Sequence, residues 1–176
     1  MKKILLAILI SLLLIITTIN IVFLIETTKD KPLREFFYSS KELPEVYSEK
    51  EKTHMQGVKN LAINSLLINL ILLIPSVYLL KKKKINLKLS GCIGLIITSI
   101  LLIFSLFFQT FFNYFHLIFF NSTNYILPSN SRLIQDYPLI YFRNIFLIIL
   151  GILTIENTIL INLKKLKNIN QLKNKR

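Results

Sequence analysis

Two histidines, His54 and His116, are the residues of this 176-residue chain best suited to acid–base chemistry. An imidazole has an ordinary pKa of about 6.5, so near neutral pH it can take a proton from a nucleophile and give it to a leaving oxygen. Acyl transfer needs these proton movements, together with a donor that stabilises the oxyanion of a tetrahedral intermediate. The pair is therefore a candidate for acyl-transfer chemistry.

Polar residues follow His116 in an unusual setting. The stretch YFHLIFFNSTNYILP, residues 114–128, places the histidine in an aromatic cluster and then continues with Asn, Ser, Thr and Asn. The side chains that we expect to bind a substrate near the two histidines are Lys59, Asn121, Tyr125, Arg132 and Arg143. A plainer interpretation is two interfacial histidines without a chemical role, because the amphipathic imidazole is tolerated at such a surface.

The sequence offers no pattern for a bound metal or cofactor. Two histidines without carboxylates at fixed spacing are a weak signal for zinc, and the single cysteine, Cys92, excludes an internal disulfide. Neither a G-x-S-x-G motif nor a glycine-rich phosphate loop is present. We therefore expect neither a metal nor a cofactor.

Long uncharged blocks show which elements must position the histidines. The chain is 53% hydrophobic with a mean hydropathy of +0.56, which excludes an ordinary soluble domain. A helix needs roughly 20 residues to cross a hydrocarbon core of about 30 Å. The sequence thus predicts a single all-α polytopic membrane domain over residues 1–176. Its spans are expected at 4–25, 60–80, 89–112 and 144–163, and the helix of the third span can extend to residue 120.

The lysines indicate the orientation of these spans. Residues 1–3, 81–88 and 164–176 carry many basic residues and no Asp or Glu, which predicts that they are cytoplasmic, as are both termini. The loops 26–59 and 113–143 are nearly neutral and would lie outside. The net charge of +13 is then a signal of topology, and we expect no nucleic-acid partner. Both histidines fall on the outer face at the same depth.

The first outer loop contains Pro32, Pro44 and short apolar groups between turn-forming residues. This pattern favours a small cap rich in strands and turns, resting on the outer helix ends. Phenylalanines recur at helical spacing between Phe104 and Phe119, which indicates packing and lipid contact. Glu156, in the fourth span, is expected to have a structural or protonated role, bonded near the cytoplasmic end to Asn157 or Lys81.

Two outer motifs resemble a known family. THMQGVKNL before the second span, and FHLIFFNSTNYILPSNSRLIQDYPLIYFRN between the third and fourth, are similar to the four-span bacterial lipoprotein intramolecular transacylases. The resemblance implies a cofactor-independent acyltransferase of the cell membrane, with its site at the outer leaflet. Its partners would be diacylglyceryl-modified lipoproteins and membrane lipid. The reaction moves the sn-2 acyl chain of the diacylglyceryl-cysteine to the α-amino group and yields a lyso-form lipoprotein.

In that reaction we expect His116 to be the general base and His54 to position the reacting groups or stabilise the oxyanion, although the two roles can be exchanged. The aromatic stripe would line the slot for the acyl chain. A different interpretation is a non-enzymatic accessory or scaffold protein of the membrane, in which the outer loop binds a partner and the histidines are dispensable. A transporter is disfavoured because the spans contain Glu156 as their sole ionisable group.

Overall fold

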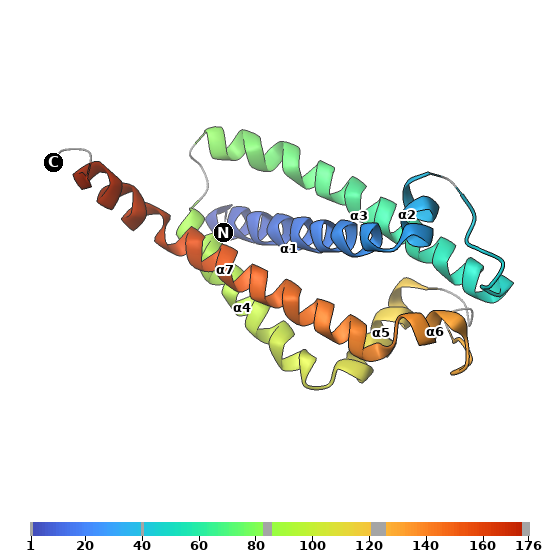
Figure 1. The fold of residues 1–176 in the computed structure, drawn as a ribbon. Coiled ribbons are helices and arrows are strands. Elements are labelled where there is room, and N and C mark those ends of the chain that lie inside the picture. Colours follow the sequence, from blue (N-terminus) through green and yellow to red (C-terminus); the bar gives the residue numbers. More distant parts are fainter. Residues whose placement is uncertain (1, 40, 83–85, 121–125, 174–176) are drawn as a thin grey trace.

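The computed structural model describes residues 2–39, 41–82, 86–120 and 126–173. Its helices, shown in Figure 1, are α1 (Lys2–Lys29), α2 (Lys31–Tyr38), α3 (Glu49–Lys81), α4 (Leu87–Ser105), α5 (Phe108–Phe119), α6 (Arg132–Asp136) and α7 (Leu139–Lys173).

Four of these helices are long and apolar enough to cross a membrane. They span Lys3–Lys29, Glu49–Lys81, Leu87–Ser105 and Leu139–Leu163, and at most about a fifth of the apolar window in each is buried inside the protein. Apolar side chains left on the outside of a long helix are stable only against lipid. The prediction of an all-α protein with four transmembrane helices is therefore confirmed. The helices extend beyond the expected spans, and the expected borders of those spans and of the loops stay predictions.

Helix α1 lies between α3 on one side and the closely packed pair of α4 and α7 on the other (Figure 1). Small residues allow α4 and α7 to approach: a Cβ added at Gly91 would come within 2.7 Å of the Asn157 carbonyl oxygen. Small residues at helix interfaces are typical of membrane proteins, where close packing replaces the hydrophobic effect. The α4–α7 pair and α1 therefore form the most closely packed part of the membrane domain.

Hydrogen bonds inside the membrane attach α1 to its neighbours. Thr18 donates to the Glu156 carboxylate on α7 at 2.9 Å, and Ser65 on α3 donates to the side-chain oxygen of Asn20 at 2.8 Å. Such bonds are favourable where no water competes for the polar groups. Glu156 thus bonds to a residue of α1, whereas Asn157 or Lys81 was the expected partner, and its structural or protonated role stays a prediction.

The predicted strand-and-turn cap is wrong: the described part of the outer loop contains no strand, and most of it lies in the end of α1, in α2 and in the start of α3, with residues 41–48 irregular. Asp30 accepts from the backbone N–H of Leu33 and so starts α2, with Pro32 in its first turn. Ser48 and Glu51 form a capping box that starts α3 well before the expected span. The short apolar groups therefore face one small core, which comprises Leu33, Phe36, Leu43, Tyr47, Met55 and Leu133.

The third predicted helix is interrupted. After α4 ends at Ser105, Leu106 and Phe107 form a turn, and α5 begins at Phe108 in a new direction (Figure 1). Phenylalanines then join α5 to α7, with the ring centroids of Phe111 and Phe146 5.1 Å apart. These phenylalanines therefore pack on one another, as the packing interpretation of the stripe predicts. The break places the second half of α5 beside the outer part of α3.

Candidate active site

The two histidines face each other across helices α3 and α5. The ring centroids of His54 and His116 are 5.8 Å apart, and the two ring planes differ by 18°. His54 lies in the second turn of α3, whose early start follows from the capping box at Ser48. His116 lies one turn before the end of α5. Two residues that the topology placed at the same depth are thus neighbours in space.

Aromatic rings surround this pair and reduce its contact with water. Phe112 lies 4.3 Å from the His116 ring, and Phe120 lies 5.3 Å from His116 and 5.2 Å from His54, between ring centroids. Both imidazoles are half-buried. Burial lowers the pKa of His116 below its ordinary value, because the imidazolium form loses hydration, while a hydrogen bond to the Phe112 carbonyl opposes this shift. Burial of His116 therefore favours its neutral form.

A hydrogen bond selects the tautomer of His116. Its Nδ1 lies 2.8 Å from the carbonyl oxygen of Phe112. A carbonyl oxygen can only accept, so in the neutral imidazole the hydrogen is on Nδ1 and the basic lone pair is on Nε2. On His54, Nδ1 is buried and has no hydrogen-bond partner among the described residues. A buried polar atom without a partner is costly in a folded protein and often marks a functional position.

The other residues expected to bind the substrate have different surroundings. Lys59 donates to the carbonyl oxygen of Phe36 at 2.6 Å and so holds α2 on α3. Arg132 forms an ion pair of 2.9 Å with Asp136 within α6, and Arg143 is exposed on α7. Asn121 and Tyr125 lie outside the described residues. Geometry thus brings the two histidines together, whereas Lys59 and Arg132 already have partners in the protein.

Glu51 is a residue of the site region that the sequence interpretation missed. Its carboxylate is 3% exposed and accepts from the backbone N–H of Ser48 at 2.8 Å and from that of Leu133 at 2.7 Å. It lies one helical turn before His54. The signal was present in the sequence as S-x-x-E, residues 48–51, which is the pattern of a capping box.

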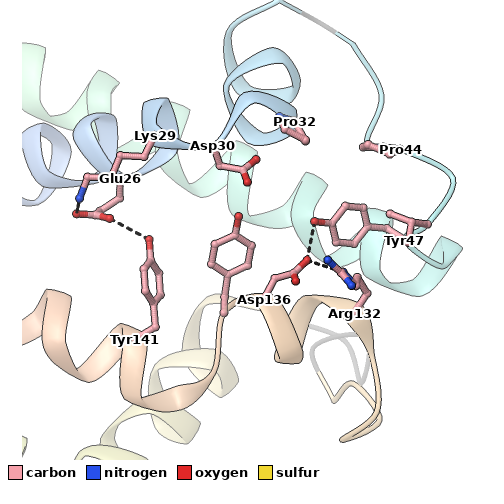
Figure 2. A pocket seen from close by; sticks show the side chains of 11 residues that line it. Glu26, Lys29, Asp30, Pro32, Pro44, Tyr47, Arg132, Asp136 and Tyr141 are labelled. Atoms are coloured by element: carbon pink, nitrogen blue, oxygen red, sulfur yellow. Dashed lines mark hydrogen bonds and ion pairs between the residues drawn. The ribbon is translucent and has the colours of Figure 1, made fainter.

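A separate pocket of about 500 Å³ lies between the α1–α2 corner and the starts of α6 and α7, as Figure 2 shows. Tyr47 donates to Asp136, and Tyr141 donates to Glu26, each at 3.1 Å. Burial, together with the hydrogen bond to Asp136, raises the pKa of Tyr47 to about 12. Two pairs of polar side chains in this pocket thus bond to each other, and its lining does not include the histidines.

The fold and the site define a class of protein: a membrane protein with four long apolar helices and a half-buried histidine pair near one end of them. Comparison with protein families agrees with this class. The family described as "Lipoprotein intramolecular transacylase Lit" matches residues 31–142, more than half of the chain, and the match includes both histidines. The chain belongs to this family, which implies acyltransferase activity on lipoproteins. Comparisons with curated proteins and with solved structures find no match.

Proposed function

We propose that this protein transfers the sn-2 acyl chain of a diacylglyceryl-modified N-terminal cysteine to the α-amino group of the same cysteine. The product is a lyso-form lipoprotein. The observation that carries the proposal is the 5.8 Å separation of the His54 and His116 rings in a chain of this family. The reaction exchanges an ester for an amide within one molecule, so neither water nor a second acyl donor is consumed.

His116 is the proposed general base. Its Nε2 takes one proton from the α-ammonium group, and the amine that results attacks the ester carbonyl carbon. A C–N bond forms and the bond between that carbon and the glycerol oxygen breaks. His116 then gives its proton to the leaving glycerol oxygen, and the second proton of the ammonium nitrogen goes to water. The bond between Nδ1 and the Phe112 carbonyl supports this role, because it keeps the lone pair on Nε2.

His54 is the proposed partner for the oxyanion of the tetrahedral intermediate. Its buried Nδ1 has no hydrogen-bond partner among the described residues, so an N–H at this atom could donate to substrate without breaking a bond within the described protein. Aromatic surroundings strengthen such a bond, because they reduce the contact of the site with water. Holding amine and ester in one molecule contributes further through effective molarity.

The remaining proposed contacts are secondary. Lys59 and Arg132 could bind substrate oxygen atoms only by exchanging their present partners, the Phe36 carbonyl and Asp136. Arg143 is exposed and has no partner to exchange among the described residues, and the roles of Asn121 and Tyr125 are proposed from the sequence alone. We further propose that the termini are cytoplasmic, which puts the histidine pair at the outer leaflet, where the substrate's tails and cysteine lie.

The direct test uses cells that cannot otherwise N-acylate their lipoproteins. The N-terminal peptide of a lipoprotein is fragmented with and without expression of this protein. We expect an N-acyl cysteine with a monoacylglyceryl group, at a total mass equal to that of the diacylglyceryl form. A free α-amine beside an intact diacylglyceryl group, in cells where the protein is correctly inserted, would contradict the proposal and favour the scaffold interpretation.

A further inference from the structure

Phe120 contacts both imidazoles and the helix that carries His54. Its backbone N–H donates to the carbonyl oxygen of His116 at 2.9 Å and so ends α5. Its ring is nearly parallel to that of His116, at 23°, and is tilted by 38° from that of His54. One side chain at the end of α5 therefore covers parts of both histidines.

Gly57 allows this arrangement. It lies three residues after His54, on the same face of α3. A Cβ added at Gly57 would lie 3.2 Å from both Cδ1 and Cε1 of the Phe120 ring, which is tighter than nine in ten contacts of real Cβ atoms. The ring is thus in contact with the backbone of α3, and a methyl group at position 57 would push it away.

Among the described residues, α3 and α5 make few direct contacts with each other. Helix α3 packs mainly on α1, whereas α5 is joined to α7, for example through Phe112 and Phe142 at 5.1 Å between ring centroids. The two histidines are therefore carried by helices that belong to different sides of the protein. Contact between Phe120 and Gly57 occurs where these two sides meet at the site.

We infer that Phe120, packed on Gly57, is a positioning residue that sets the spacing of His54 and His116 and shields both rings from water. The inference rests on the proposed function for its kinetic consequence. It assigns Phe120 no contact with the reacting atoms. An error of about 1 Å in the position of a catalytic group can lower a rate by about a hundredfold, so this spacing is a sensitive quantity.

The test compares Gly57→Ala, Phe120→Leu and the double variant in liposomes that contain a diacylglyceryl lipopeptide. We expect Phe120→Leu to lower kcat by about tenfold or more with a smaller effect on KM, and Gly57→Ala, which requires the ring to move by only a few tenths of an ångström, to lower kcat by less. The double variant should be about as active as Phe120→Leu alone, because the smaller Leu side chain leaves room for the added methyl group. If the two effects multiply, the contact does not determine the spacing and the inference is wrong.

Two matched controls separate positioning from general damage. Gly151→Ala adds a methyl group in α7 with nothing within 4 Å among the described residues, and Tyr78→Leu shortens a ring that is 58% exposed at the opposite end of α3 from His54. Both should leave kcat unchanged within about twofold, since surface changes away from such features have small effects. A loss in these controls as large as in the test variants would also overturn the inference.

A readout that does not require activity distinguishes this inference from the proposed function. Diethyl pyrocarbonate modifies accessible neutral imidazoles, and mass spectrometry can follow His54 and His116 separately. Phe120→Leu should raise the modification rate of both histidines by about threefold or more, whereas Tyr78→Leu should not. If the wild-type protein transfers no acyl chain but the modification pattern holds, the proposed function fails and the positioning role of Phe120 stands. If the wild type transfers the acyl chain but Phe120→Leu leaves the modification rates unchanged, the proposed function stands and the role of Phe120 fails.

Discussion

The carboxylate of Glu51 accepts a hydrogen bond of 2.7 Å from the backbone N–H of Leu133, which joins the first turn of α3 to the start of α6. The same carboxylate accepts from the backbone and hydroxyl of Ser48. A carboxylate that is 3% exposed is stable in this position because each bond replaces one to water. Glu51 therefore holds in place the turn of α3 that leads to His54.

Replacing Glu51 by Ala should destabilise the protein. The change leaves the N–H groups of Ser48 and Leu133 without their acceptor, and a buried unpaired donor costs about 1–3 kcal/mol. Thermal unfolding in detergent should show a lower midpoint. Glu49→Ala is the matched control, because that side chain is 88% exposed and bonded only to Lys52. Equal midpoints for the two variants would contradict this role.

Replacing His116 or His54 by Ala should lower the rate of acyl transfer by about 10²–10⁴-fold, the usual contribution of a positioned general acid–base group. Insertion into the membrane should be unaffected, which protease accessibility of the outer loops can check. Gln56→Ala, an exposed change on the same helix as His54, is the control and should retain full activity. Activity that survives in both histidine variants would remove the basis of the mechanism.

The pH profile should reflect the buried state of His116. Burial lowers its pKa, so the neutral base persists to lower pH, and the acid limb of the rate should fall below about pH 6.5. The described groups that face this ring are His54 from α3 and the rings of Phe112, Phe115 and Phe120. Phe120→Leu admits water and should move the limb upward. A limb above pH 6.5 in the wild type would contradict the burial argument.

Thr18→Val should weaken the contact between α1 and α7, because it removes the donor to the Glu156 carboxylate. Hydrogen bonds between membrane helices contribute about 0.6 kcal/mol on average, up to about 2 kcal/mol. We expect a small decrease in the unfolding midpoint in a mild detergent. Thr158→Val is the control, since this exposed hydroxyl bonds only to Thr154 in its own helix. A decrease in the midpoint of the control that is larger than that of Thr18→Val would show that the hydrogen bond between α1 and α7 does not stabilise the protein.

Some of the architecture could be predicted from the sequence because its cause is local. An uncharged run must cross the membrane as a helix, so the four long helices follow from composition. Lysines between the runs give a prediction of which ends face outward. From these two facts alone His54 and His116 were expected at one level, although their 5.8 Å contact depends on packing between separate helices.

Other features could not be obtained in this way. The first outer loop was predicted to form strands because its apolar groups are short. The N-cap residues Asp30 and Ser48, which start helices α2 and α3, were given too little weight. The break at Leu106 and Phe107 occurs without Gly or Pro, so no residue type marks it. The contact of Phe120 with Gly57 joins distant segments, and the bond of Lys59 to Phe36 uses a backbone oxygen. Tertiary structure alone determines such contacts.

The most direct measurement is to follow a deuterium label placed only in the sn-2 acyl chain of a synthetic diacylglyceryl lipopeptide. The purified protein in liposomes is mixed with this peptide, and the product is fragmented by mass spectrometry, with the His116→Ala variant in parallel. We predict that the deuterated chain appears on the α-amino nitrogen at unchanged total mass with the wild type, and stays on glycerol with the variant. A label that remains on glycerol with the wild type, or equal transfer by both proteins, would contradict the account.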